Sequence, residues 1–278
     1  VQNTLSAQPF SVDRQAHFSH GQGGATMKQI LVTGSSGFIG KELFRFLNKN
    51  QFKLTPLSHQ DILAYQNRNE LFPAKELATI DGIINLAGVS ISQRWNEKTK
   101  ARILESRLST TRFLVDSLQC AKELQLPIPS VFINASGIGY YGIAPTGIQT
   151  EASPPGTDFL ASVCQQWEQA ALHAERLGIR TVIGRFGVVL GTSGGALPRM
   201  ALPFHWGVGG TIGDGTQHLS WIHLQDLLQA LQLALTSSSL QGAYNFTSPS
   251  PVPMRQFAAF LGKQLKKPAW TRLPGTAA

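Results

Sequence analysis

The sequence predicts an α/β fold in which a doubly wound parallel sheet carries a smaller C-terminal substrate lobe. Three observations support this prediction. Short apolar segments alternate with segments of helical periodicity, a glycine-rich turn follows the first apolar segment, and the composition becomes rich in Gly and Pro after Gly187. Strands that alternate with helices favour parallel pairing with right-handed crossovers.

The elements follow a regular order from Met27 onward. We expect strands at 29–34, 52–58, 81–88, 129–136 and 242–248, and a strand followed by a turn at 179–191. We expect helices at 38–50, 96–124, 158–177, 223–235 and 253–267. Residues 191–220, rich in Gly and Pro, belong to the expected lobe, which would pack against the carboxyl edge of the sheet.

The helix expected at 158–177 has recognisable ends. Asp158 is a suitable N-cap, and Gly178 lies just beyond the last turn. Its apolar positions repeat at helical spacing: Leu160, Val163, Cys164 and Trp167. This spacing predicts a helix that faces the core.

Composition indicates a globular protein. The chain has 278 residues, of which 42% are hydrophobic and 27 are glycine, enough to bury a large core. No apolar segment is long enough to span a bilayer, so we expect no membrane partner and a cytoplasmic location. The two cysteines, Cys120 and Cys164, fit neither a disulfide framework nor a metal site, which favours a reducing compartment.

The formal net charge of +8 raises the question of an anionic partner. The basic residues are scattered, so a solvated surface explains them better than a nucleic acid, while a phosphate-bearing ligand would benefit from the field. Residues 1–26 show no periodicity and no signal-peptide core. We expect them to be a disordered extension or an expression remnant, with a transit peptide as the alternative.

A glycine motif, G-x-x-G-x-x-G, lies between the first strand and the first helix. It comprises Gly34, Ser35, Ser36, Gly37, Phe38, Ile39 and Gly40. Glycine at these positions allows a tight turn, close approach of backbone N–H groups to a diphosphate, and close helix–sheet packing. We therefore predict a dinucleotide-binding Rossmann core over 27–186. Residues 187–278 would form mostly the lobe, with late Rossmann elements and a C-terminus that ends early.

The end of the second strand bears on the choice between NAD and NADP. An acidic residue there would bind the ribose of NAD, whereas a basic group would accept the 2′-phosphate of NADP. Ser58 and His59 occupy that place, and Asp61 follows them. No acid stands in the expected register, so we predict NADP in slight preference to NAD. Asp61 lies either near the adenine edge or in the cap of a turn.

Longer strings make the chain resemble the short-chain dehydrogenase/reductase superfamily in its atypical, extended form. They include TGSSGFIG, INLAG at 84–88, INASGIGYYG and WIHLQD at 221–226. FLASVCQQWEQAA, RFGVVLGTSGGALPRM and GGTIGDGTQHLSWIH are similar to the YfcH-type, NAD-dependent epimerase/dehydratase-like family. The resemblance implies that Leu86, Ala87 and Gly88 contact the cofactor, and that the substrate is a nucleotide sugar or a related metabolite.

The chemistry that the resemblance implies is incomplete in this chain. In that superfamily a Tyr, with a Lys four residues later, handles the proton while nicotinamide exchanges a hydride, and a Ser bonds the substrate oxygen. Ser136 matches the Ser, although it could equally bond to backbone. The places of the Tyr and the Lys fall on Leu160 and Cys164, and the sequence has no Tyr-x-x-x-Lys. Tyr140 and Tyr141 are the best substitutes; aromatic packing is the alternative.

Other residues are candidates for ligand binding. Arg185, at the end of a strand, could pair with a cofactor phosphate or with a backbone carbonyl. Arg94 and Trp95 could line the cleft, with a core position as the alternative for Trp95. His223 and Asp226 belong to a motif that we expect to be architectural, and 207–215 could form a flap over the substrate.

Two functions from different classes remain open. The first is an NAD(P)-dependent epimerase or oxidoreductase, and the second is a non-catalytic NAD(P)(H)-binding sensor or scaffold. An RNA-binding role would rest on the charge alone. In each case we expect a small-molecule ligand, with a homodimer left open.

Overall fold

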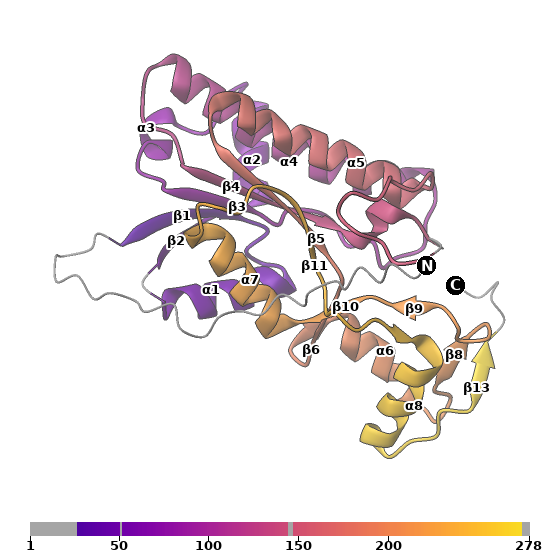
Figure 1. Ribbon diagram of the computed structural model, residues 1–278. Coiled ribbons are helices and arrows are strands. Elements are labelled where there is room, and N and C mark those ends of the chain that lie inside the picture. The colour runs from indigo at the N-terminus through magenta and orange to yellow at the C-terminus, as the bar shows by residue number, and fades with distance from the viewer. Residues whose placement is uncertain (1–26, 51, 144–146, 274–278) are drawn as a thin grey trace, which may run out of the picture.

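The computed structural model describes residues 27–50, 52–143 and 147–273. Its centre is a six-stranded sheet in which every neighbouring pair is parallel (Figure 1). From one edge to the other the strands are β11 (Gly242–Phe246), β5 (Arg180–Phe186), β4 (Val131–Gly137), β3 (Gly82–Asn85), β1 (Lys28–Thr33) and β2 (Phe52–Leu57). This order confirms the predicted doubly wound fold.

The chain reverses direction across the sheet between β1 and β3. From β1 it goes first to β2 on one side, and then returns to add β3, β4, β5 and β11 on the other side. In such a sheet the connections leave the carboxyl ends of the two central strands in opposite directions, and a crevice opens between them. The glycine motif follows β1 directly, so it lies at this crevice.

Helices cover both faces of the sheet. On one face lie α1 (Phe38–Asn48) and α7 (Leu224–Thr236), and on the other lie α4 (Glu97–Glu123) and α5 (Phe159–Leu172) (Figure 1). Two short helices, α2 (His59–Asn67) and α3 (Ala74–Leu77), precede β3. Alternate residues of β1 enter separate cores, with Ile30 in one and Leu31 in the other. Both faces of a parallel sheet are thereby buried, as expected.

The helix predicted at 158–177 is present, but its last part is tighter than an α-helix. Asp158 accepts a hydrogen bond from the backbone N–H of Ala161 at 3.1 Å, which confirms it as the N-cap. After α5 the chain continues as the 3₁₀ helix η2 (His173–Leu177). Gly178 ends it with φ +81°, a left-handed conformation that glycine adopts without strain.

The smaller lobe is built from two separate parts of the chain. The first part contains β6 (Val188–Gly191), β7 (Gly194–Gly195), α6 (Ala196–His205), β8 (Gly210–Ile212) and β9 (His218–Leu219). It leads through β10 (Trp221–His223) into α7. The second part contains β12 (Val252–Pro253), α8 (Met254–Leu265) and β13 (Thr271–Leu273). Helices α6 and α8 share a small core of Ala201, Phe204, Ala258 and Leu261.

The two parts of the lobe are joined by strand pairing, with β12 on β9 and β13 on β8. Part of the predicted flap, 207–215, therefore forms the paired strand β8, and movement of this segment stays a prediction. No helix in the described part of the chain combines the length and the hydropathy needed to cross a membrane. The predicted extension at 1–26 and the end of the chain beyond residue 273 lie outside the described residues.

Candidate functional site

A cavity of about 240 Å³ lies in the crevice between the carboxyl ends of β1, β2 and β3. The glycine turn, the start of α2 and the face of α4 enclose it. Its lining includes nine of the predicted cofactor residues: Gly34, Ser35, Ser36, Gly37, Ser58, His59, Leu86, Ala87 and Gly88. The structure thus brings together the glycine motif and the two strand ends that the sequence placed near a dinucleotide.

The geometry of the turn explains its glycines. Gly34 has φ +69°, and a Cβ there would lie 2.6 Å from the carbonyl oxygen of Leu86. A Cβ at Gly40 would lie 2.3 Å from the carbonyl oxygen of Gly34. Only glycine fits at either place, so the backbone of the turn is held close against β3 and α1.

The first turn of α1 is open to an anion. Gly37 is its N-cap and has no side chain to bond the free N–H groups of the helix. Such N–H groups, with the positive end of the helix dipole, bind phosphate readily. Phe38 and Ile39 begin the helix here, although their side chains are not part of the cavity lining. The residues present therefore fit the diphosphate of a dinucleotide.

Ser58 and Asp61 form a capping box at the start of α2. The backbone N–H of Asp61 donates to Ser58 Oγ at 3.1 Å, and Ser58 donates its N–H at 3.0 Å and its hydroxyl at 2.6 Å to Asp61 Oδ2. Hydrogen bonds from the Ser58 hydroxyl, and then from its backbone N–H, lower the pKa of Asp61. Of the two positions considered for Asp61, the structure shows the cap.

A chain of buried polar side chains links the carboxyl ends of the central strands. Thr33 donates to Asn85 Oδ1 at 2.6 Å, and Asn85 Nδ2 donates to Asn134 Oδ1 at 2.6 Å and to Thr111 Oγ1 at 2.8 Å. Trp167 Nε1 also donates to Thr111, at 2.9 Å. These bonds fix β1, β3 and β4 against α4 and α5, so the wall of the crevice is rigid.

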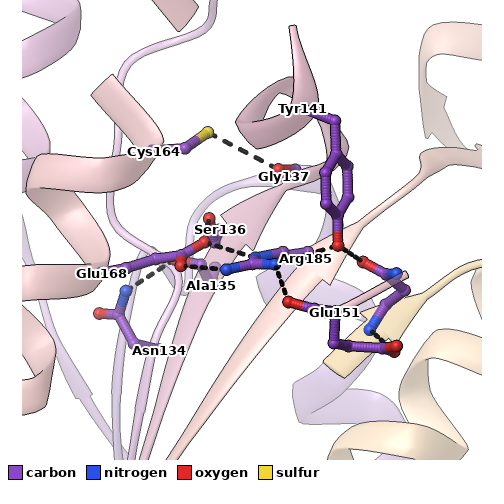
Figure 2. A network of polar contacts seen from close by, with 10 residues as sticks. Asn134, Ala135, Ser136, Gly137, Tyr141, Glu151, Cys164, Glu168 and Arg185 are labelled. Atoms are coloured by element: carbon purple, nitrogen blue, oxygen red, sulfur yellow. Dashed lines mark hydrogen bonds and ion pairs between the residues drawn. The ribbon is translucent and has the colours of Figure 1, made fainter. Parts of the chain in front are cut away.

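Arg185 of β5 and Glu168 of α5 form a buried ion pair near the carboxyl ends of β4 and β5 (Figure 2). Arg185 Nη2 is 2.8 Å from Glu168 Oε2, and Arg185 Nε donates to Glu168 Oε1 at 3.0 Å. Arg185 and Glu168 are only 4% and 5% exposed. Burial lowers the pKa of Arg185, but the hydrogen bonds to Glu168 and Tyr141 outweigh burial and raise it overall, so the guanidinium stays charged.

Ser136 and Tyr141 both form hydrogen bonds with this ion pair. The Ser136 hydroxyl donates to Glu168 Oε1 at 2.6 Å. The Tyr141 hydroxyl accepts from Arg185 Nη1 at 3.0 Å and donates to Asn245 Oδ1 at 2.7 Å. Burial raises the pKa of Tyr141, and the hydrogen bonds from Arg185 and to Asn245 offset this only in part. The phenol therefore keeps its proton at neutral pH.

Arg185 also contacts the neighbouring aromatic ring and a loop carbonyl. Its Cζ lies 3.4 Å from the centroid of the Tyr140 ring, and Nη1 donates to the carbonyl oxygen of Glu151 at 3.2 Å. Of the two partners considered for Arg185, the structure shows a backbone carbonyl together with Glu168. A contact with a cofactor phosphate stays a prediction.

The helix that bears Leu160 and Cys164 forms an apolar wall of the site. Cys164 Sγ donates to the carbonyl oxygen of Gly137 at 3.7 Å (Figure 2). Burial raises the pKa of the Cys164 thiol, which keeps it protonated and poorly nucleophilic. A Cβ added at Gly139 would lie 3.4 Å from Leu160 Cβ, so the helix packs closely against η1 (Ile138–Tyr141). Leu160 has no exchangeable proton, and the Cys164 thiol is bonded to a backbone carbonyl.

A second and larger cavity, of about 720 Å³, lies between the end of β11 and the lobe. Tyr141 and Asn245 line it from the sheet side. The other lining residues come from the loops after η1, before β10 and after β11, and include Gln149, Gln217, His218, Ser220, Thr247 and Ser248. The cavity thus offers hydroxyl, amide and imidazole groups beside a buried phenol.

The remaining candidates for ligand binding lie on the loop that carries Arg94 and Trp95 and at the start of α7. Trp95 is 37% exposed, donates to the carbonyl oxygen of Ile91 at 2.8 Å and packs edge-on against Phe159. Arg94 is exposed on the same loop. His223 is the N-cap of α7 and accepts from the N–H of Gln225 at 3.2 Å, and Asp226 stands in the first turn of that helix. This arrangement suits the architectural role expected for them.

Four residues of the site were not among those predicted. Ser106 and Thr110 line the smaller cavity from α4, Asn245 bonds Tyr141, and Glu168 holds both Ser136 and Arg185. The sequence carried a signal for Glu168, because it follows Cys164 by four residues and so extends the apolar face of α5 with a charged residue. Asn245 lies in a short strand whose partner strand is not evident from the sequence.

Comparison with known proteins shows how this chain is related. A model of the NAD dependent epimerase/dehydratase family matches residues 30–246. Epimerase family protein YfhF of Bacillus subtilis is 39% identical over 255 residues, which cover 88% of this chain and 82% of that protein. Human epimerase family protein SDR39U1, solved with NADPH, is 34% identical with a TM-score of 0.76, covering 90% of this chain and 84% of that one.

More distant structures share the fold. UDP-glucuronic acid 4-epimerase from Bacillus cereus, solved with UDP-glucuronic acid and NAD, has a TM-score of 0.72 at 20% identity, covering 88% of this chain and 85% of that one. The narrower YfcH-type label stays a prediction. The glycine turn, the strand order and these matches agree, and the chain belongs to the NAD dependent epimerase/dehydratase family.

Proposed function

We propose that the protein binds NADP(H) in the smaller cavity and carries out epimerase-like oxidation and reduction of a hydroxylated metabolite in the larger one. The observation that carries the proposal is the smaller cavity. It is enclosed by a turn that has no room for a Cβ at Gly34 or Gly40, by the open N-terminus of α1, and by the ends of β2 and β3. These features together suit a dinucleotide.

Two arguments favour NADP over NAD. Ser58 and His59 line the cavity at the end of β2, and the carboxylate of Asp61 is already bonded to Ser58 in the cap. A ribose hydroxyl would therefore compete with that cap for the only acid in this segment. The human relative, which is 34% identical, was solved with NADPH.

When bound, nicotinamide would supply the hydride acceptor or donor, and the protein would supply the proton and the positioning. Tyr141 is the group suited to hold that proton, because this residue lines the larger cavity and the raised pKa of its phenol keeps it protonated. Arg185 and Asn245 fix the orientation of this hydroxyl. We propose that Ser136, whose hydroxyl donates to Glu168, accepts a hydrogen bond from the substrate at its oxygen.

The larger cavity suits a ligand rich in hydroxyl groups. Its side-chain amides and hydroxyls can each donate and accept, as sugar hydroxyls require. A nucleotide sugar or a related metabolite remains the proposed substrate class, and the family match supports it.

Calorimetric titration with NADP⁺, NADPH, NAD⁺ and NADH tests the binding proposal. We expect the NADP forms to bind more tightly than the NAD forms. The absence of binding by all four would refute it. A panel of nucleotide sugars, followed by the absorbance of the reduced nicotinamide and by epimer formation, then tests turnover. Ser136→Ala and Tyr141→Phe should each reduce turnover; unchanged rates in both would place the chemistry on other residues.

A non-catalytic NADP(H) sensor is the second candidate. It is favoured by the hydrogen bonding of the site, because the hydroxyl protons of Ser136 and Tyr141 are both already donated, to Glu168 and to Asn245. A sensor would bind cofactor and change the arrangement of the lobe without turnover. Tight NADP(H) binding, no turnover on any substrate, and cofactor-dependent protection of the lobe from proteolysis would identify it.

A further inference from the structure

Arg107 lies in α4 directly behind the wall of the smaller cavity. Ser106 and Thr110 line that cavity, and Thr110, three residues after Arg107, lies on the same side of the helix as Arg107. The guanidinium packs against Gly88, which also lines the cavity. A Cβ at Gly88 would lie 2.9 Å from Arg107 Cζ and 3.1 Å from Nη1. The absence of a side chain at Gly88 therefore lets this cation approach the cavity.

The charge of Arg107 is not neutralised within the described residues. Nη1 donates to the carbonyl oxygens of Val89 at 3.2 Å and Ile103 at 2.9 Å, and Cζ lies 5.1 Å from the centroid of the Trp167 ring. None of the ion pairs among those residues includes Arg107. Burial lowers the pKa of Arg107, because the guanidinium is partly withdrawn from water. A desolvated cation without an anion is an expensive arrangement unless a ligand completes it.

Arg107 also has hydrogen-bond donors left over. A guanidinium carries five N–H groups, and all the hydrogen bonds described for Arg107 come from Nη1. No fully buried side-chain nitrogen or oxygen of the described residues lacks a partner. The N–H groups on Nε and Nη2 are therefore reachable from outside the protein core, as contacts with a ligand require.

The position of Arg107 in the sheet order indicates which half of a dinucleotide it meets. The adenosine half belongs at the end of β2, beside Ser58 and His59. Gly88 follows β3, on the other side of β1. The Cζ of Arg107 lies 5.1 Å from the ring centroid of Trp167, on the helix whose Cys164 Sγ bonds Gly137 at the end of β4. Arg107 thus lies on the side away from the adenosine half.

We propose that Arg107 is a cofactor-binding residue that contacts the nicotinamide half of the dinucleotide. The inference rests on the proposed function, and it adds to Arg185 a second cation on this side of β1, next to the smaller cavity. Arg107 supplies positive charge and N–H donors to phosphate and ribose oxygens next to Gly88.

The test compares two probes and three variants. NADP⁺ contains both halves of the dinucleotide, whereas 2′,5′-ADP lacks the nicotinamide half. Arg107→Met removes the charge but keeps most of the side-chain volume. Arg107→Lys keeps the charge but lacks the planar guanidinium with its several N–H donors. Arg180→Met is the matched control, because Arg180 also bonds two carbonyl oxygens, those of Leu235 and Leu240, but lies at the opposite end of the sheet, where β5 begins.

Calorimetry on the purified full-length chain measures the affinities, and thermal unfolding without ligand reports on folding. We expect Arg107→Met to weaken NADP⁺ binding by about 10- to 100-fold, the range for a hydrogen bond to a charged group. Binding of 2′,5′-ADP should change by no more than about twofold, a difference well under 1.4 kcal/mol. Arg107→Lys should lie between Arg107→Met and the wild type, and Arg180→Met should match the wild type with both probes.

The outcomes separate this inference from the proposed function. If the wild type binds neither probe, the proposed function fails and the inference fails with it. If the wild type binds and Arg107→Met binds NADP⁺ equally well, only the inference fails. An equal loss with both probes would overturn it too, since Arg107 would then merely support the Val89 loop.

Discussion

Glu168→Gln tests whether the buried ion pair is the structural centre of the site. The substitution keeps the volume but removes the charge opposite Arg185, and it brings an amide N–H toward a guanidinium that can only donate. The side chains of Arg185 and Glu168 are 5% and 7% exposed, and their atoms are 2.8 Å apart. Breaking such a pair costs about 3–5 kcal/mol, because it leaves a buried charge without a partner.

Thermal unfolding followed by circular dichroism measures the cost. At roughly 2–4 °C per kcal/mol for a chain of this size, the midpoint should fall by about 10 °C. Glu70→Gln is the control, because Glu70 pairs with Arg68 at 2.7 Å but both side chains are about half exposed, at 51% and 55%. That exposed pair should contribute less than about 1 kcal/mol. If Glu168→Gln costs no more than Glu70→Gln, the ion pair is not the structural centre of the site.

Three further substitutions test the turn, the phenol and the cap. Gly34→Ala should abolish cofactor binding and destabilise the fold, because its Cβ would lie 2.6 Å from the Leu86 carbonyl oxygen. Gly207→Ala is the control, because Gly207 has φ +76° but open space around it, and it should lower the free energy of unfolding in denaturant by only about 1 kcal/mol. Tyr141→Phe should lower stability by about 1–3 kcal/mol, since Arg185 and Asn245 lose a buried partner, and equal stability of the variant and the wild type in urea would contradict this. Because the folded pKa of Asp61 is lowered, its carboxylate stabilises the protein above the unfolded pKa, and this contribution is lost as the pH falls through the folded pKa below 3.8. Asp61→Asn should therefore reduce the loss of unfolding free energy at low pH. It should also raise the NADP-to-NAD affinity ratio by about two- to tenfold, because it removes a negative charge near the 2′-phosphate. An unchanged ratio in calorimetry would place that phosphate elsewhere.

Sequence reasoning predicted the part of the site that depends on local backbone geometry. The glycine turn could be recognised because positive φ and close backbone approach restrict Gly34 and Gly40 to one residue type. The cap at Asp158 and the end at Gly178 were predictable for the same reason, since a helix terminus is determined by a few adjacent residues.

The part that depends on contacts between distant segments could not be predicted in the same way. Glu168, Arg185 and Asn245 come from a helix and two strands, and nothing in the sequence shows that they meet. The sequence predicted Ser136 and Tyr141 as polar groups of the site, but it did not show that their hydroxyl protons are donated to Glu168 and Asn245. Such partners depend on sheet order and helix rotation, which local pattern does not determine.

The two-part lobe has a consequence for how the molecule assembles. As the chain is synthesised, β1 to β5 and their helices can pair and bury their cores before β8 and β9 have partners, because those partners, β13 and β12, come last. Until β13 is made, the glycine-rich segment that contains β8 has no strand to pair with. The dinucleotide crevice can therefore form early, whereas His218 of β9, which lines the larger cavity, pairs with a strand that is made later. A chain shortened before Thr271 should keep the crevice and lose the strand pairing that orders β8.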